Sequence, residues 1–239
     1  MQTTGINMTT AFVTGATGLL GANLVHTLVE RGWTVRALVR SKDKAETQFG
    51  DLDVEVVEGD MARVSDFAEK LIGADVLFHT AAYFRDSYKG GSHWEKLYQI
   101  NVTGTEDLME AAWDSGVRRM VHISSTATVL PPPGRAGNED DRRDTSDAHD
   151  DYFRSKVMSD LSVEAFMKQH PKFEVSFVLP GFMQGPRDLG PTSAGQMLLD
   201  FAHKRVPAVI DVQMSFVDAR DVAVGVVLAA ERASRGAAT

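Results

Sequence analysis

Residues 14–21 read Thr-Gly-Ala-Thr-Gly-Leu-Leu-Gly (TGATGLLG), and this stretch decides the fold. It lies between a short apolar run, residues 11–13, and an amphipathic helical pattern. Gly15 permits a tight turn, Gly18 lets the backbone approach a pyrophosphate, and Gly21 allows close packing of the helix on the strand. The helix N-terminus adds free N–H groups and the positive end of a dipole. A glycine pattern in this strand-turn-helix context predicts a dinucleotide-binding turn.

Outward from this turn, short β-branched runs alternate with helical patterns. Strands are expected at 11–13, 34–39, 54–57, 75–79, 118–123 and 175–179. Helices are expected at 18–31, 41–48, 63–71, 93–115, 152–169, 193–203 and 218–231. Because the strands are continuously apolar and alternate with helices, the order predicts a parallel sheet covered on both faces. The predicted fold class is therefore α/β, with a Rossmann-type doubly wound parallel sheet.

The net charge, the cysteine content and the lengths of the apolar runs limit which partners and which cellular compartment are expected. The chain has 239 residues, with 25 Lys or Arg against 33 Asp or Glu, so its formal net charge is −8. This balance argues against nucleic acid and anionic membrane as partners. The absence of cysteine excludes disulfides and thiol nucleophiles, and it fits a reducing cytoplasm. No apolar run approaches the ~18–20 residues of a membrane helix, and the start of the chain does not read as a signal peptide.

One long loop breaks the alternation. Pro131-Pro132-Pro133-Gly134 opens it, and it runs to about Asp151 with seven acidic residues between 139 and 151. Two arginines, Arg142 and Arg143, lie among them. The loop is either a solvated, mobile segment or a lid over a pocket.

The end of the second strand is placed to bind the ribose of a dinucleotide. Arg40 lies 19 residues after Gly21, where NAD enzymes carry an acidic residue for the 2′-hydroxyl. A guanidinium there matches a 2′-phosphate instead. The sequence therefore predicts NADP (NADPH) in preference to NAD, with a basic surface turn as the alternative. Asp60, after the third strand, either meets the adenine amino group or caps a helix.

Three side chains form a candidate catalytic group. Tyr152 and Lys156 are four residues apart on one helix face. A phenol has a pKa near ~10, and a nearby ammonium lowers it, which makes tyrosine a usable proton donor. The run Ser124-Ser125-Thr126 ends the fifth strand, at the edge where open sheets bind ligands. A hydroxyl there can donate a hydrogen bond to a substrate carbonyl while hydride arrives from a nicotinamide.

The sequence resembles the extended short-chain dehydrogenase/reductases of the NAD-dependent epimerase/dehydratase superfamily, most closely the dihydroflavonol 4-reductase-like group. The matching pieces are TGATGLLG (14–21), VRALVR (35–40), GDM (59–61), HTAA (79–82), NVTGT (101–105), HISST (122–126), YFRSK (152–156), PGFMQGP (180–186) and DARDVA (218–223). The resemblance implies that Tyr152 donates a proton, that Lys156 also holds the nicotinamide ribose and that Ser125 polarises the carbonyl. Ser124 and Thr126 are alternatives for that hydroxyl.

The resemblance also implies binding residues. Those for the cofactor are Gly15, Thr17, Gly18, Leu19, Leu20, Arg40, Asp60, Met61, Thr80, Ala81, Ala82, Tyr152, Lys156, Pro180 and Gly181. Asn101 is expected to position helix and backbone. Tyr83, Phe84 and Met183 are expected to face a planar or apolar carbonyl substrate, and packing beneath a loop is the alternative. The seven histidines have no metal-site spacing, so no metal is expected.

The predicted function is NADPH-dependent reduction of a ketone or aldehyde. The alternatives are a nucleotide-sugar epimerase or dehydratase and a non-catalytic NADP-binding sensor or scaffold. Residues 1–180 are expected to form the cofactor domain, with 181–239 as substrate-region segments interleaved with its last elements. Family members are longer, so we expect an incomplete substrate region, either from truncation or in a compact variant. Association as a homodimer would cover the bare sheet edge.

Overall fold

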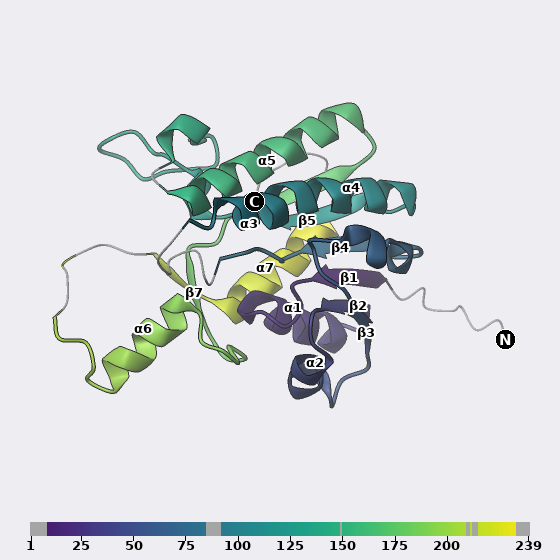
Figure 1. Cartoon of the computed structure of the whole chain (residues 1–239), viewed down its shortest axis with the longest axis horizontal. Helices are drawn as coiled ribbons and strands as arrows, with labels where there is room; N and C mark the ends of the chain where they lie inside the picture. Colours follow the sequence, from purple (N-terminus) through teal and green to yellow (C-terminus); the bar gives the residue numbers. More distant parts are fainter. Residues whose placement is uncertain (1–8, 85–91, 149, 209–210, 212–214, 233–239) are drawn as a thin grey trace.

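Six parallel strands form the centre of the protein, in the order β3-β2-β1-β4-β5-β6 (Figure 1). The structure, a computed structural model, describes residues 9–84, 92–148, 150–208, 211 and 215–232. The strands of this sheet are β1 (Thr10–Thr14), β2 (Thr34–Val39), β3 (Val54–Glu58), β4 (Val76–His79), β5 (Arg119–Ile123) and β6 (Glu174–Val178). The predicted parallel sheet is confirmed.

Seven α-helices and several shorter helical segments connect and cover the strands in the described part of the chain. The α-helices are α1 (Leu19–Glu30), α2 (Lys42–Phe49), α3 (Trp94–Leu97), α4 (Gly104–Asp114), α5 (Asp151–Gln169), α6 (Ser193–Ala202) and α7 (Ala219–Arg232). The short segments are η1 (Val64–Asp66), η2 (Ala68–Leu71), η3 (Tyr98–Thr103), η4 (Thr126–Thr128) and η5 (Thr145–Asp147).

The central strands are apolar on both sides because each side packs under helices. In β1, Ala11 and Val13 join one hydrophobic cluster while Phe12 joins the other, as the alternation of side chains along a strand requires. The first cluster includes residues of α1, α2 and α7. The second includes residues of α4 and α5. In Figure 1, α4 and α5 lie above the sheet and α1 and α2 below it, so the sheet is wound on both faces.

The strand order reverses between β1 and β4, and this reversal places the candidate site. From β1 the chain adds β2 and then β3 on one side, and it then returns to add β4, β5 and β6 on the other. Thr14 and His79, the last residues of β1 and β4, are paired in register. Open parallel sheets bind ligands at the carboxyl ends of the strands beside such a reversal. The glycine turn follows β1, Thr80 follows β4, and the serine run of the candidate catalytic group follows the neighbouring β5.

Two predicted helices differ from the observed ones. Residues 63–71 form the two short 3-10 segments η1 and η2 instead of one helix. The predicted helix at 93–115 is observed as α3, the π-helix η3 and α4 in succession. Gly104 lies so close to the backbone that a Cβ there would be 2.7 Å from the Met61 carbonyl oxygen. This tertiary contact coincides with the change from π-helix to α-helix.

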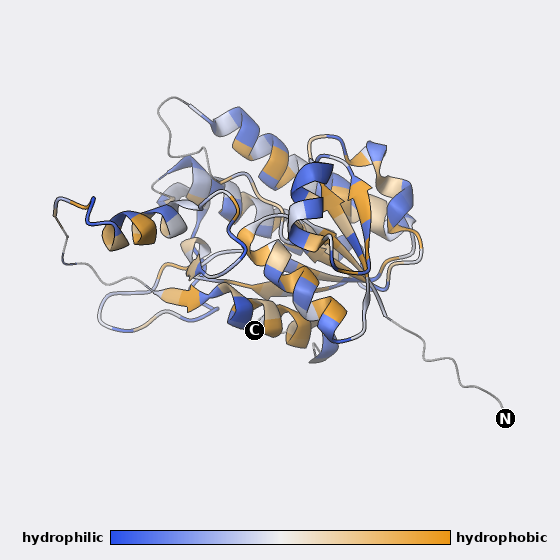
Figure 2. Cartoon of the chain, turned by 90° about the horizontal axis from the view of Figure 1, so that it is seen from below, coloured by the Kyte–Doolittle hydropathy of each residue, from blue (hydrophilic) through white to orange (hydrophobic). Residues whose placement is uncertain are grey.

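A second, two-stranded sheet follows β6. The strands β7 (Phe182–Gln184) and β8 (Phe216–Asp218) pair in parallel, with Phe182 opposite Phe216. The helix α6 lies between them in sequence, and only Ala194 of its residues is buried. Figure 2 shows apolar residues of this helix on the outside of the molecule. No helix among the described residues is both long enough and apolar enough to cross a membrane.

Candidate active site

The glycine turn has the geometry that a dinucleotide phosphate requires. Gly15 has φ +65°, which favours glycine, and a Cβ there would lie 2.7 Å from the Ala81 backbone. The Gly18 N–H donates to the Gly15 carbonyl at 2.9 Å and closes the turn. A Cβ on Gly21 would lie 2.2 Å from the Gly15 oxygen, so the helix packs on the turn as predicted.

The start of α1 fits an anionic group. Its cap, Gly18, offers no side-chain hydrogen bond, and the first turn contains no acidic residue. The side chains of Leu19 and Leu20 are buried in the core, so their backbone N–H groups are what they offer a ligand. The half-buried Thr17 lies in the same turn. These residues fit the pyrophosphate of a dinucleotide, because unpaired N–H groups and the helix dipole both favour negative charge there.

The residues expected around the ribose and adenine lie after β2 and β3. Arg40 directly follows β2, and its side chain is exposed. Within the described residues its guanidinium has no ion-pair partner, whereas the nearby Lys42 pairs with Glu58 at 3.1 Å. Asp60 Oδ1 accepts a hydrogen bond from the Ala62 N–H at 2.9 Å, so this oxygen caps a turn. The Met61 side chain is buried in the second hydrophobic cluster, which leaves its backbone for a ligand.

The end of β4 is fastened to the end of β1. Thr80 Oγ1 donates to the Thr14 carbonyl at 2.6 Å, and the Ala81 N–H donates to Thr14 Oγ1 at 3.2 Å. Ala82, the next residue, is exposed. Thr80 and Ala81 therefore form one wall of the glycine turn.

Tyr152 and Lys156 lie near the start of α5. The Asp150 side chain caps this helix by accepting from the Phe153 N–H at 2.8 Å. Lys156 is only 3% exposed, and its Nζ donates to the Ile123 carbonyl at 2.7 Å, at the end of β5. Burial lowers the pKa of Lys156, and the charge of Asp160 opposes that shift. Tyr152 is half-buried, and its ring contacts Phe84 edge-to-face with centroids 4.7 Å apart.

In the serine run at the end of β5, the hydroxyl of Ser124 is buried and that of Ser125 is partly exposed. Ser124 is buried, and its Oγ donates to Asp160 Oδ2 at 2.6 Å. Ser125 is half-buried, and its Oγ accepts from the Ala127 N–H at 3.1 Å, which leaves its proton for another acceptor. The Thr126 N–H donates to the Pro180 carbonyl at 3.1 Å. Pro180 and the following Gly181 thus lie beside the serine run.

Asn101 is a positioning residue, as predicted. Its Oδ1 accepts from the Tyr83 N–H at 2.7 Å, and its Nδ2 donates to the Tyr83 carbonyl at 3.1 Å. Nδ2 also donates to Ser155 Oγ at 3.0 Å, next to Lys156 on α5. Asn101 therefore joins the backbone after β4 to α5, the helix of the candidate catalytic pair. It lies in the π-helix η3, a conformation that often marks functional sites.

The three expected substrate residues are placed differently. The Tyr83 side chain is buried in the second hydrophobic cluster, and its hydroxyl is 3.1 Å from His93 Nδ1, so the structure favours packing for this residue. Phe84 contacts the Tyr152 ring and lies at the candidate site. Met183, in β7, is half-buried against the first cluster.

The loop from 130 to 148 is fastened by arginines. Arg135 forms a bidentate pair with Asp141, and Arg143 donates to the carbonyls of Ala127 and Val129. Arg142 reaches Asp160 on α5 at 3.3 Å. Under the loop, beside the serine run, is a hollow of about 310 Å³, lined by Thr126, Val129, Pro131, Gly137, Asn138, Glu139 and Leu179. This arrangement agrees better with a wall or lid than with a free loop.

Two buried histidines were not recognised as neighbours from the sequence. His79 and His122 are paired in the β4–β5 register, and their rings stack with centroids 5.6 Å apart. Thr105 Oγ1 donates its proton to the Asn101 carbonyl at 2.8 Å, so it accepts from His79 Nε2. The other ring nitrogen of a neutral His79, Nδ1, then accepts from Thr14 Oγ1. Burial holds the pKa of His79 well below its ordinary value, which agrees with this neutral ring.

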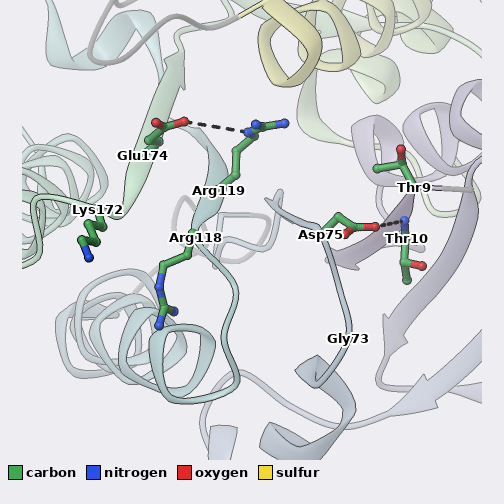
Figure 3. Close-up of a pocket in the computed structure, with 8 residues that line it drawn as sticks. All are labelled: Thr9, Thr10, Gly73, Asp75, Arg118, Arg119, Lys172 and Glu174. Atoms are coloured by element: carbon green, nitrogen blue, oxygen red, sulfur yellow. Dashed lines mark hydrogen bonds and ion pairs between the residues drawn. The ribbon is translucent and has the colours of Figure 1, made fainter. Parts of the chain in front are cut away.

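A second hollow lies away from this group. It has a volume of about 650 Å³ and lies at the amino ends of the strands, the edge opposite the glycine turn (Figure 3). Its lining residues are Thr9, Thr10, Gly73, Asp75, Arg118, Arg119, Lys172 and Glu174. Its charged groups are partnered in part among themselves, since Asp75 accepts from the Thr10 N–H and Arg119 pairs with Glu174. Among the described residues, no group of three metal-ligating side chains comes together.

Comparisons with known proteins agree with this geometry. The model of the NAD dependent epimerase/dehydratase family matches residues 11–239. The chain is 38% identical to sterol demethylase protein B of Methylococcus capsulatus, over 95% of this chain and 67% of that protein. It is 33% identical to a Synechocystis protein provisionally named a dihydroflavonol 4-reductase, over 92% of this chain and 63% of that protein.

A solved structure gives the same result for the fold. The crystal structure of gox2253 superposes with a TM-score of 0.84 at 33% identity, covering 93% of this chain and 66% of that one. The predicted family and fold class are thus confirmed, and the family description names NAD as the cofactor. The chain spans about two thirds or less of the length of these relatives.

Proposed function

Because the chain belongs to the NAD dependent epimerase/dehydratase family, we propose that it is an NADPH-dependent oxidoreductase that reduces a ketone or an aldehyde. One observation carries the proposal. The buried Lys156, one helical turn after Tyr152, donates a hydrogen bond from its ammonium to the carbonyl of Ile123. Ile123 is the last residue of β5 and lies two residues before Ser125. Phenol, ammonium and hydroxyl are thereby placed at the carboxyl edge of the sheet, the edge that also carries the glycine turn.

Each of these residues has a definite part in the proposed reaction. A bound reduced nicotinamide supplies the hydride. Ser125 donates a hydrogen bond to the substrate carbonyl and stabilises the negative charge that develops on its oxygen. Tyr152 then gives that oxygen a proton, which yields the alcohol and leaves a phenolate. The Lys156 charge stabilises the phenolate.

The choice of Ser125 follows from the hydrogen bonds of its neighbour. The Ser124 hydroxyl proton is already donated to Asp160, so Ser124 is a poor donor to a substrate. Ser125 has an accepting bond from the Ala127 N–H and retains its proton. Thr126, which is exposed, is the remaining alternative.

The preference for NADPH rests on Arg40. Its exposed guanidinium follows β2, and no acidic residue adjoins it in the sequence VRSKDK (39–44) until Asp43. A phosphate accepts two charge-assisted hydrogen bonds from a guanidinium, whereas a neutral ribose hydroxyl forms a weaker hydrogen bond with it.

The substrate is proposed to be an apolar carbonyl compound. Phe84 contacts the catalytic phenol, and Phe182 of β7 is exposed beside the segment that contains Pro180 and Gly181. Aromatic faces of this kind favour flat, apolar ligands. The names of the two relatives refer to a sterol and to a dihydroflavonol, and both are ring compounds.

The test is NADPH oxidation with a panel of aromatic and alicyclic ketones and aldehydes. Tyr152→Phe is expected to lower kcat by about 10²- to 10⁴-fold, the usual contribution of a general acid. Tyr98→Phe, the same change on another tyrosine, is the matched control and should leave kcat unchanged. Equal turnover by Tyr152→Phe would refute the catalytic assignment. NADPH binding without turnover of any compound would favour the sensor or scaffold alternative.

The cytoplasmic location, the homodimer and the absence of a nucleic-acid partner stay predictions from composition and from the family resemblance.

A further inference from the structure

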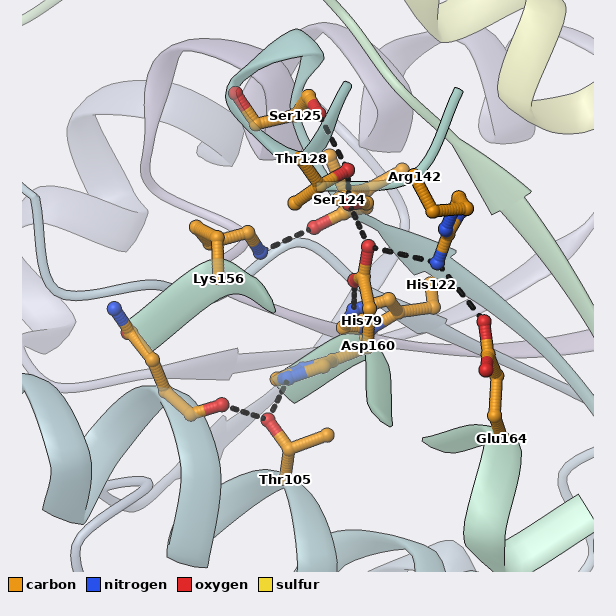
Figure 4. Close-up of polar contacts among 12 residues, drawn as sticks. His79, Thr105, His122, Ser124, Ser125, Thr128, Arg142, Lys156, Asp160 and Glu164 are labelled. Carbon is orange, nitrogen blue, oxygen red and sulfur yellow. Dashed lines mark hydrogen bonds and ion pairs between the residues drawn. The ribbon is translucent and has the colours of Figure 1, made fainter. Parts of the chain in front are cut away.

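A buried carboxylate, which the proposed reaction does not use, lies directly behind the catalytic group. Asp160 is 1% exposed and lies one helical turn after Lys156 on α5. Its Oδ2 accepts from Ser124 Oγ at 2.6 Å, and its Oδ1 is 3.1 Å from His122 Nε2 (Figure 4). Arg142 Nη2 lies 3.3 Å from Oδ2. Asp160 therefore contacts β5 and the loop that follows it.

These contacts keep the carboxylate ionised. Burial alone would raise the pKa of Asp160, but the hydrogen bonds from His122 and Ser124 and the Lys156 charge hold that pKa below its ordinary value. A buried charge is tolerated only where partners of this kind surround it.

His122 is fixed as a neutral donor to Asp160. Burial lowers the pKa of His122, against the opposing effect of its hydrogen bond to Asp160. Within the described residues its Nδ1 has no hydrogen-bond partner, so a proton there would be buried and unpaired. The ring therefore carries its proton on Nε2, which points at Asp160 Oδ1.

The Lys156 ammonium needs a negative charge close by. Lys156 is buried and donates to the Ile123 carbonyl, and the charge of Asp160 favours its protonated form. Residues four apart lie on the same side of a helix, so the Asp160 carboxylate supplies a negative charge on the side of α5 that carries Lys156. The other titratable or charged groups that the described residues place around the pair are Tyr152 and Glu164 of α5, His79 of β4, His122 of β5 and Arg142 of the loop.

Asp160 also connects the loop to the serine run. Arg142, whose backbone bridges Val129, reaches inward to Asp160 and outward to Glu164 at 3.0 Å. Asp160 in turn holds Ser124, the residue before the proposed catalytic hydroxyl. Asp160 is thus one link between the loop and the end of β5, beside the bonds that Arg143 makes to the backbone after the serine run.

We propose that Asp160 is a positioning residue for this reaction, which supplies the buried negative charge opposite Lys156 and fixes the end of β5 through Ser124. The proposal rests on the proposed reductase function. It assigns Asp160 no contact with the substrate. Its effect on catalysis acts through Lys156 and through the orientation of Ser125.

The test compares Asp160→Asn with Asp160→Glu and with Glu164→Gln. Asp160→Asn removes the charge at nearly constant volume, and we expect kcat to fall about 10- to 100-fold, as for other losses of positioning. The alkaline limb of the kcat profile, where Lys156 loses its proton, should move to lower pH. Asp160→Glu should keep that limb in place. Glu164→Gln neutralises the next acid on the same helix face and should leave kcat within about twofold, because its carboxylate lies near solvent.

A second readout uses the protein without cofactor or substrate. The ¹⁵N shifts of the His122 ring should report a proton on Nε2 in the native protein. In Asp160→Asn these shifts should move, because a neutral side chain replaces the carboxylate that accepts the proton. If Asp160→Asn does not fold, Ser124→Ala keeps the charge and removes one bond. It should lower kcat at least about threefold with the pH limb unmoved, since one hydrogen bond to a charged group is lost.

The outcomes separate this inference from the proposed function. If the native protein reduces carbonyl compounds and Asp160→Asn leaves kcat and the pH limb unchanged, the inference fails alone. A loss of kcat with an unmoved limb would show a merely structural role and overturn it as well. If the native protein has no reductase activity, the proposed function fails. The inference is then judged on the pH dependence of NADPH affinity and on the ¹⁵N shifts of the His122 ring, and it is overturned if Asp160→Asn changes neither.

Discussion

The helices α1 and α6 show how differently two parts of this chain use apolar residues. Eight of the 12 residues of α1 are buried, whereas α6, with 10 residues, buries only Ala194. Leu24 in α1 is 0% exposed, while Leu198 in α6 is 49% exposed and Phe201 is 63% exposed. The helix α1, which follows the glycine turn, therefore buries its apolar side chains against the rest of the described protein. The segment from β7 to β8 carries apolar surface that the described residues do not cover.

This difference suggests separate roles for the six-stranded sheet and for the segment from β7 to β8. The glycine turn, Arg40 and the candidate catalytic group all lie at the ends of the six-stranded sheet or on helices packed against it. The helix α6 lies in sequence between β7 and β8, and the exposed Phe182 of β7 is one of the residues proposed to face the substrate. Folding and cofactor binding should thus depend on the first part, and substrate choice on the second.

The largest expected effect is on stability, from a matched pair of leucine truncations. Leu24→Ala should lower the free energy of unfolding by about 2–5 kcal/mol, because it leaves a cavity in the core. Leu198→Ala should lower it by less than about 0.5 kcal/mol, as is usual at exposed sites. Denaturant unfolding measures both. Similar losses from the two variants would erase the contrast between α1 and α6.

A pair of glycine substitutions separates backbone strain from crowding at the turn. Gly15→Ala should cost about 1–2 kcal/mol for its left-handed backbone and about 1–3 kcal/mol more for the contact with Ala81. Gly32→Ala has φ +78° but open space around its Cβ, so only the first cost applies. NADPH binding should be lost in Gly15→Ala and kept in Gly32→Ala. Equal destabilisation by the two changes would show that the approach of Ala81 to the turn is not tight.

The third prediction concerns cofactor choice. Arg40→Ser should raise the Kd for NADPH about 10- to 100-fold, because hydrogen bonds to charged groups contribute about 1.5–3 kcal/mol. The Kd for NADH should change little. Phe201→Ser, in α6, is the control from the other region and should leave both affinities unchanged. Isothermal calorimetry decides the matter, and equal native affinities for NADPH and NADH would contradict the assignment of Arg40.

The smallest effect is a pH dependence of stability from the buried histidines. The folded-state pKa of His79 is well below its ordinary 6.5, so below pH 6.5 the unfolded chain binds a proton that the folded protein does not. Stability should therefore fall as the pH falls from 7 to 5, by at most about 1.4 kcal/mol per pH unit for each such histidine. His79→Gln should have a shallower slope. A slope identical to that of the native protein would show that His79 does not titrate in this way.

Much of the sheet could be predicted from the sequence because each strand and the glycine turn have a recognisable pattern within a few consecutive residues. The apolar runs from β1 to β6 were placed within one residue at either end, since a strand buried on both faces must be apolar throughout. TGATGLLG was recognisable because Gly15 and Gly21 are required by contacts within a few residues of the turn or with the adjoining strand end.

The parts that escaped prediction depend on distant contacts. β7 and β8 are three residues each and pair across more than 30 residues, so neither has a periodic pattern of its own. The π-helix η3 forms where Asn101 binds the Tyr83 backbone. The contact of His79 with His122 follows from the register of β4 and β5, which no local pattern gives.

The central claim is that Tyr152 protonates a carbonyl that has received hydride at the carboxyl edge of this sheet. The most direct test supplies NADPH deuterated at the transferable position, together with a carbonyl compound that the protein turns over. The account predicts one deuterium on the carbinol carbon of the alcohol, formed about 10²- to 10⁴-fold more slowly by Tyr152→Phe, with an NADPH Kd within about twofold of the native value. A product without deuterium, or equal rates for the two proteins, would contradict it.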